Sequence, residues 1–172
     1  SRPEGIMGTS CLLVVVVPPG GEATGRQALA DAEAALRSAE ARMSTWIDAS
    51  EISLLNQAEA GEAVDLSPES LRVLRYGREV FEATDGAFDL TCGPLIQLWR
   101  RSGESGALPS EAAIREAREQ SEWEHFTLMD TRAVKTKGSA RVDLGGIAKG
   151  FGIDRAVEAM EAAGAPGGLV DG

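Results

Sequence analysis

The chain has 172 residues, of which 43% are hydrophobic and 26% charged, a composition typical of a globular domain with a hydrophobic core. Its formal net charge of −10 argues against nucleic acid as a partner, because proteins that bind nucleic acids present basic surfaces. The most apolar run, residues 11–17, is much shorter than the roughly 20 residues that a membrane-spanning helix requires.

The first half of the chain predicts one strand followed by helices. An apolar, valine-rich run ends at two prolines and two glycines, the pattern of a buried strand. The helices that follow have apolar residues three and four positions apart or begin at a serine cap. The predicted elements are a strand over residues 6–17, a helix over 24–42, a short helix beginning near Ser50, and a helix from Ser67 to about Ala83.

The second half opens with an irregular apolar segment, residues 87–99, which has no clean period and is typical of a chain that lines a pocket. Beyond it we predict a helix from Ser110 to Gln120, a hairpin over 126–135, a strand over 141–143, a helix over 147–163 and a strand beginning at 168–170. The mixture of helices and hairpins predicts an α+β fold. No partner follows the last strand, which suggests that the chain is interrupted there.

Cysteine and histidine usage limits the metal chemistry. Cys11 and Cys92 lie far apart in the sequence, and His125 is the only histidine, so a zinc site of the usual Cys/His kind is nearly excluded. Spacing alone cannot decide whether the cysteines form a disulfide, and we expect both to pack as small apolar side chains. We interpret His125, at the start of a predicted strand, as structural.

Residues 141–155 carry the most informative pattern. A short apolar stretch ends in Asp143, two glycines follow, and a helix opens with Lys149 in its first turn. Free amides at a helix start can hold an anion, so an acid and a lysine here suggest a metal–phosphate site. Gly150 follows the lysine where a P-loop needs Ser or Thr, and Arg155 stands where a dinucleotide fingerprint needs glycine. The alternative is a tight strand-to-helix joint in which the glycines only permit close packing.

Four separated segments together resemble the ApbE-type FAD:protein FMN transferase family, in order and spacing, across almost the whole chain. They are residues 7–9 (Met-Gly-Thr), residues 43–46 (Met-Ser-Thr-Trp) with 50–56 (Ser-Glu-Ile-Ser-Leu-Leu-Asn), residues 84–95 (Thr-Asp-Gly-Ala-Phe-Asp-Leu-Thr-Cys-Gly-Pro-Leu) with Leu98-Trp99, and residues 143–150 (Asp-Leu-Gly-Gly-Ile-Ala-Lys-Gly). Four matches in sequence are far more specific than any one of them.

The resemblance implies a T-fold-like α+β architecture, with helices packed on antiparallel sheets, in which residues 1–172 form the N-terminal part of a single domain. It implies binding of FAD and Mg²⁺, and transfer of FMN from FAD to a serine or threonine hydroxyl of an acceptor protein with release of AMP. Metal and amide donors aimed at a pyrophosphate suit that chemistry. A divalent cation would also offset the repulsion between an anionic ligand and an acidic chain.

By position in the family's motifs, eight residues correspond to site residues, and no catalytic residue can be named. The FAD contacts would be Met7, Trp46, Ala87, Phe88, Asp89, Asp143 and Lys149, and Gly146 would offer a main-chain carbonyl to the metal. Each has a plainer alternative: Trp46 as a core side chain, Asp89 as a turn cap, Lys149 as a solvated helix residue and Met7 as strand packing.

Family members are longer than this chain, and the part that they carry beyond this point brings further FAD contacts and the side-chain metal ligands. Three interpretations therefore stay open: an incomplete transferase, a non-catalytic flavin-binding or maturation-accessory domain, and a remnant that binds nothing. Intact pocket motifs favour the first two. By analogy we expect a periplasmic or membrane-anchored extracytoplasmic location, in which a removed lipid anchor would be the only membrane contact, with a cytoplasmic location as the alternative.

Overall fold

Six α-helices and two antiparallel sheets make up the computed structural model, which describes residues 1–172. They divide between two compact units: a terminal unit of Ser1–Ser44 with Ile147–Gly172, and a central unit of Thr45–Gly146. The predicted α+β class with antiparallel sheets is confirmed. The assignment of residues 1–172 to a single domain stays a prediction.

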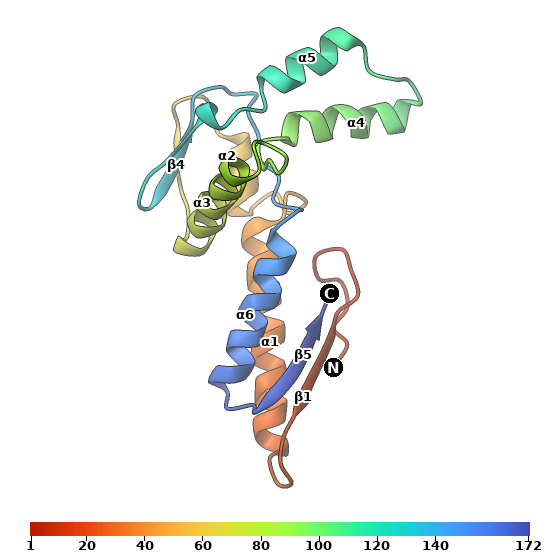
Figure 1. Cartoon of the computed structure of the whole chain (residues 1–172), viewed down its shortest axis with the longest axis vertical. Helices are drawn as coiled ribbons and strands as arrows, with labels where there is room; N and C mark the ends of the chain where they lie inside the picture. The colour runs from red at the N-terminus through yellow and green to blue at the C-terminus, as the bar shows by residue number, and fades with distance from the viewer. The chain divides into compact units, whose positions relative to one another are not determined.

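The terminal unit joins the two ends of the chain. β1 (Leu12–Val16) pairs antiparallel with β5 (Gly167–Asp171), from Leu12 opposite Asp171 to Val16 opposite Gly167. α1 (Glu22–Met43) and α6 (Ala148–Ala162) run side by side next to this ribbon (Figure 1). No helix of the chain combines the length and the apolar character needed to cross a membrane.

Small side chains set the packing of the two long helices. Ala28, Ala32 and Leu36 lie four positions apart on α1 and are buried, as are Ala156 and Met160 on α6. Alanines at the contact let the two helices approach closely, and the larger side chains fill the space beside them.

Two expectations about this unit are wrong. The last strand does have a partner, because β5 pairs with β1 at the other end of the chain. The first strand is also shorter than the predicted residues 6–17, since Ile6 and Thr9 form an isolated bridge around a turn before β1 begins.

The central unit holds the shorter elements. Its three-stranded sheet has the order β2-β4-β3, with both neighbouring pairs antiparallel. The elements are α2 (Glu51–Gln57), β2 (Ala63–Asp65), α3 (Pro68–Ala83), α4 (Gly93–Ser105), α5 (Glu111–Glu119), the 3₁₀ helix η1 (Trp123–His125), β3 (Phe126–Leu128) and β4 (Arg132–Lys135). The predicted hairpin is confirmed as β3 and β4, whereas the sequence did not predict strand β2.

Serine caps fix where three of these helices begin. The side chains of Ser50, Ser67 and Ser110 each accept a hydrogen bond from the main-chain N–H three residues later, at 3.0 to 3.2 Å. Such caps satisfy one of the amides that a helix start leaves without a partner. The predicted starts of all three helices are confirmed, and so is the prediction that Ser110 is a cap.

About half of the segment 87–99, which the sequence predicts to be irregular, is helical, because α4 includes residues 93–99. α4 begins at Gly93, with Pro94 in its first turn, where a proline costs no hydrogen bond. It ends at Ser105, and the next residue, Gly106, caps it in the left-handed conformation with a φ of 70°. Residues 87–92 remain without regular structure, and these residues belong to the candidate site.

Two glycines of α4 make a matched pair for a stability test. A Cβ built at Gly93 would lie 2.8 Å from the main-chain oxygen of Arg141, whereas nothing lies within 4 Å of a Cβ at Gly103. We predict that Gly93→Ala lowers the free energy of unfolding by about 1–3 kcal/mol through overpacking against main chain. Gly103→Ala should raise it by up to about 1 kcal/mol, because alanine favours a helix.

Urea unfolding of both variants, followed by circular dichroism, measures the difference. Equal effects of the two substitutions would show that α4 does not approach residue 141 as closely as described.

Candidate functional site

The loop after α3 presents three of the predicted site residues. The Thr84 hydroxyl donates to the Val80 carbonyl at 2.7 Å and accepts the Phe88 N–H at 3.1 Å. Asp85 and Gly86 have φ angles of 51° and 77°, so the chain reverses here through left-handed conformations. The reversal turns the chain out of the helix and into the Ala-Phe-Asp triplet at residues 87–89.

The carboxylate of Asp89 is held by its own loop. The Thr91 N–H donates to Asp89 Oδ1 at 2.7 Å, and the Thr91 hydroxyl lies 2.8 and 3.0 Å from the two carboxylate oxygens. Thr91 is fully buried and Asp89 is half-buried. Asp89 therefore closes a local turn, as its plainer alternative states, and the turn also fixes the direction of its charge. Ala87, also in this loop, is exposed and donates its N–H to the Thr84 carbonyl at 3.1 Å.

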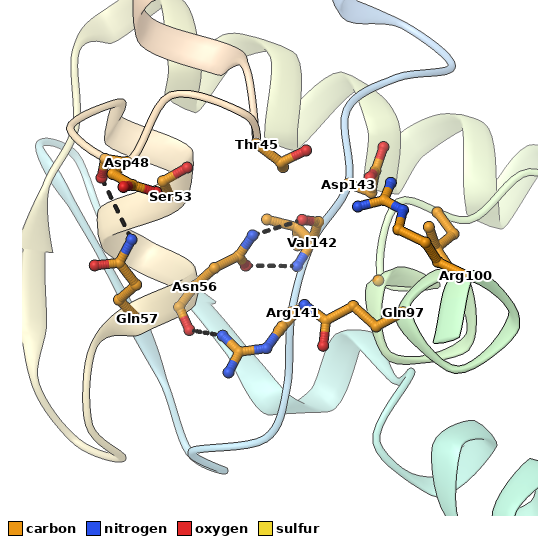
Figure 2. A pocket seen from close by; sticks show the side chains of 12 residues that line it. Thr45, Asp48, Ser53, Asn56, Gln57, Gln97, Arg100, Arg141, Val142 and Asp143 are labelled. Atoms are coloured by element: carbon orange, nitrogen blue, oxygen red, sulfur yellow. Dashed lines mark hydrogen bonds between the residues drawn. The ribbon is translucent and has the colours of Figure 1, made fainter. Parts of the chain in front are cut away.

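The segment before Asp143 is not the strand that the sequence predicts. The Val142 N–H donates to Asn56 Oδ1 and the Val142 carbonyl accepts from Asn56 Nδ2, both at 2.8 Å (Figure 2). The Asp143 N–H donates to the Leu90 carbonyl at 2.8 Å. Backbone groups of this buried segment thus find partners in a side chain and a loop, which replace a neighbouring strand.

A buried lysine holds the approach to the same segment. Lys135, at 0% exposure, donates from Nζ to the main-chain oxygens of Asn56 at 2.7 Å, Gly138 at 2.8 Å and Ala140 at 3.3 Å. Burial lowers the pKa of Lys135, and the nearby positive charge of Arg141 lowers the pKa further. Three carbonyl acceptors offset the cost of burying this ammonium group.

The two loops meet, and this brings together four of the predicted residues: Phe88, Asp89, Asp143 and Gly146. A Cβ at Gly146 would lie 3.1 Å from the Phe88 ring, so only a residue without a side chain fits without displacing that ring. Burial raises the pKa of the Cys92 thiol, and the charges of Asp89 and Asp143 both raise it further. Two carboxylates from different loops therefore act on one thiol.

Asp143 is also fixed by a turn of its own. Its Oδ1 accepts the Gly145 N–H at 2.8 Å, and the neighbouring Val142 and Leu144 side chains are both buried at 1% exposure. The two buried neighbours anchor the chain on either side, while Gly145 and Gly146 are exposed. Exposed glycine main chain allows a ligand to come close to the peptide groups.

A polar cavity of about 270 Å³ adjoins Asp143. Arg100 and Arg141 line it together with Asn56, Gln97 and Thr45, and Figure 2 shows their side chains around the same space. With mainly polar walls, it suits a charged or hydrogen-bonding group better than a flat apolar ring.

Trp46 is exposed, at 77%, so its alternative as a core side chain is wrong. The Arg100 guanidinium lies 4.3 Å from the centre of the Trp46 ring, a distance typical of a cation–π contact. The indole is thereby placed beside a residue that lines the cavity.

The other two predicted residues lie in the terminal unit. Met7 has a φ of 51°, donates its N–H to Glu40 Oε1 at 2.6 Å, and places its side-chain methyl against Gly152 of α6. A left-handed methionine is uncommon and marks a conformation that its surroundings impose. Lys149 is exposed in the first turn of α6, one turn before Gly152.

The donors for a metal ion are incomplete. No group of three or more His, Cys, Asp or Glu side chains is placed to hold a metal ion. Gly146 can offer its main-chain oxygen, but no such cluster of side chains lies around it to complete the ligand set. The residues described here do not make a magnesium site by themselves.

His125 and the cysteines behave as the sequence predicts. His125 is buried and its Nε2 lies 3.0 Å from the Glu119 carbonyl, which supports a structural role. Both cysteines are free, with Cys11 buried and Cys92 partly buried.

Sequence reasoning missed three residues that shape the site: Asn56, Thr91 and Lys135. Lys135 carried a usable signal, because strand alternation places it on the same face as the buried Ala133. Asn56 and Thr91 lie inside the matched motifs, but their partners, Val142 and Asp89, follow only from the fold.

Cys92 offers a test of this geometry without any ligand. Replacing Asp89 or Asp143 by asparagine removes a negative charge that raises the pKa of Cys92, so more of the thiol is ionised at pH 8. We predict faster alkylation of Cys92 by iodoacetamide in both variants, and more so for Asp89→Asn. Peptide mass spectrometry separates Cys92 from Cys11. The control Asp65→Asn removes a charge that is paired with Arg132 and should leave the alkylation rate unchanged. Equal alkylation rates in all variants would show that Asp89 and Asp143 do not both lie near Cys92.

The chain is similar to known proteins of one family. The model of the ApbE family matches residues 7–172. The FAD:protein FMN transferase of Haemophilus influenzae is 32% identical over 151 residues, 81% of this chain and 42% of that protein. That of Vibrio cholerae is 28% identical over 167 residues, 96% of this chain and 50% of that protein. The chain thus spans about half the length of the relatives it matches.

Solved structures agree. A variant of the flavin transferase ApbE from Vibrio cholerae has a TM-score of 0.87 at 26% identity, over 99% of this chain and 59% of that one. The ApbE protein of Thermotoga maritima has a TM-score of 0.86 at 27% identity, over 99% and 55%. Sequence and fold together show that the chain belongs to the ApbE family.

Proposed function

We propose that the chain binds FAD and supplies the FAD-binding part of an FAD:protein FMN transferase. Family membership supports the flavin. The observation that carries the assignment to this site is the meeting of residues 87–92 and 141–146, where the charges of Asp89 and Asp143 both act on Cys92 and the exposed Gly146 lies against the Phe88 ring.

The proposed reaction transfers the FMN phosphoryl group from the pyrophosphate of FAD to a hydroxyl oxygen of the acceptor protein. A serine or threonine hydroxyl of the acceptor protein attacks the phosphorus on the FMN side of the FAD pyrophosphate. A new O–P bond forms, the bond from that phosphorus to the bridging oxygen breaks, and AMP leaves with that oxygen. The hydroxyl proton passes to a general base, a role that we assign to no residue of this chain.

The residues of the central unit would bind and orient FAD. The exposed main chain at Gly146 suits phosphate oxygens, since the Gly145 N–H is already taken by Asp143 Oδ1, and Asp89 and Asp143 suit N–H or hydroxyl donors of the flavin ring or ribose. The Trp46 indole offers a stacking surface. Roles for Met7 and Lys149 in FAD binding, and for Gly146 as a metal ligand, remain part of this proposal.

Magnesium belongs to the proposal as well. It would lower the repulsion between the pyrophosphate and a chain of net charge −10. Gly146 can supply one oxygen, and the remaining ligands would come from phosphate oxygens and from groups outside the residues described here.

A second candidate function is flavin binding without transfer, as in a maturation-accessory domain. It would need the residues that bind FAD but no base and no acceptor hydroxyl. For either function we propose an extracytoplasmic location by analogy, with an acceptor protein as partner only in the first.

The first prediction concerns affinity for FAD. Asp143→Ala removes a charged hydrogen-bonding group from the site and should weaken FAD binding about tenfold or more in the presence of Mg²⁺. Asp65→Ala removes a surface carboxylate elsewhere in the central unit and should change the affinity by less than about twofold. Titration of flavin fluorescence gives both constants; equal affinities of wild type and Asp143→Ala would remove Asp143 from the site.

The second concerns transfer. We predict that a polypeptide of residues 1–172 binds FAD but does not flavinylate an acceptor, because its metal site is incomplete. The intact mass of an acceptor protein after incubation with FAD and Mg²⁺ gives the answer. Gain of one FMN group would contradict this and would establish transfer by this chain alone.

A further inference from the structure

The side-chain carboxamide of Asn56 contacts the main chain of Val142, which lies 86 positions later in the sequence. It uses both its donor and its acceptor on a single residue, with the two hydrogen bonds to Val142 each 2.8 Å long. We propose that Asn56 is a positioning residue, which sets the Val142 main chain and thereby the place of the Asp143 carboxylate in the ligand site. This inference rests on the proposed function for its ligand, FAD.

Asn56 is itself held firmly. It lies near the end of α2, a helix capped by Ser50 and anchored by Ile52 and Leu55, both at 0% exposure. Its main-chain oxygen accepts hydrogen bonds from Lys135 and Arg141. The carboxamide therefore extends from a fixed point, and with an exposure of 8% the residue has little room to take another rotamer.

Few main-chain hydrogen bonds hold the segment that Asn56 contacts, although the side chains of Val142 and Leu144 are buried. Residues 136–146 form no strand, and near Asp143 the further main-chain contact is the hydrogen bond from the Asp143 N–H to Leu90. Because Asp143 follows Val142 directly, any tilt of the Val142 peptide moves the Asp143 side chain. The hydrogen bonds of Asn56 replace the adjacent strand that would otherwise fix this tilt.

Arg78 provides a matched control. Like Asn56, it ties a distant loop of the central unit through two main-chain oxygens, those of Trp123 at 3.1 Å and Phe126 at 3.0 Å. Arg78→Met therefore removes a similar pair of contacts, but none on the segment that carries Asp143.

The test combines Asn56→Ala and Asn56→Asp with Asp143→Ala in double-mutant cycles. Asn56→Asp keeps the acceptor for the Val142 N–H and places a second oxygen against the Val142 carbonyl, so it serves if the alanine variant does not fold. We expect each Asn56 variant to weaken FAD binding about fivefold or more in the wild-type background and by less than about twofold in the Asp143→Ala background. Arg78→Met should leave FAD affinity within about twofold of wild type.

A second readout needs no flavin. If Asp143 moves, its charge acts less on Cys92, so the pKa of Cys92 falls and alkylation at pH 8 becomes faster. This increase should vanish when Asp143 is already alanine. Arg78→Met should not produce it.

The outcomes separate the two proposals. Additive losses of FAD affinity, or an unchanged alkylation rate of Cys92 in Asn56→Ala, would overturn the positioning role; Asn56→Asp is judged by FAD affinity alone, because its own carboxylate would raise the pKa of Cys92. Failure of the wild-type protein to bind FAD would overturn the proposed function, and the Cys92 cycle would still decide whether Asn56 places Asp143.

Discussion

The pair of hydrogen bonds between the Asn56 carboxamide and the Val142 peptide is the contact on which the candidate site depends. It ties a helix near the start of the central unit to a segment near its end. The hydrogen bond from Asp143 to Leu90 then ties that segment to the loop that carries Asp89. Two loops without regular structure thereby acquire the fixed geometry that strands would give, while their main chain stays open to a ligand.

Positive side chains lie near the candidate site of this acidic chain. The chain is acidic as a whole, yet positive groups lie close to the site: Lys135 buried behind it, and Arg100 and Arg141 at the cavity. Lys135 has its donors taken by carbonyl oxygens, so it stabilises the loop and is not available to a ligand. Arg100 lies over the Trp46 ring, is exposed, and lines the same cavity as Asp143.

Much of the fold followed from the sequence, because its signals are local. Serine caps at Ser67 and Ser110 and the spacing of apolar residues along α1 locate helices without reference to the rest of the chain. The pairing of β5 with β1 did not follow, since strand partners at opposite ends of a chain leave no local pattern. The predicted strand at residues 141–143 failed for a related reason: its partner is one side chain, Asn56.

The site was only partly predictable. Family resemblance located Phe88, Asp89, Asp143 and Gly146, and the structure brings them together. The residues that hold them in place, Asn56, Thr91 and Lys135, act through hydrogen bonds whose partners are known only once the chain is folded.

Hydrogen exchange of the amides, measured with and without FAD and Mg²⁺, tests the central claim most directly. FAD bound at the meeting of the two loops should slow exchange in residues 87–92 and 143–146 and leave the β3–β4 hairpin unchanged. Protection confined to other parts of the chain, or no protection at concentrations where FAD is bound, would contradict the account.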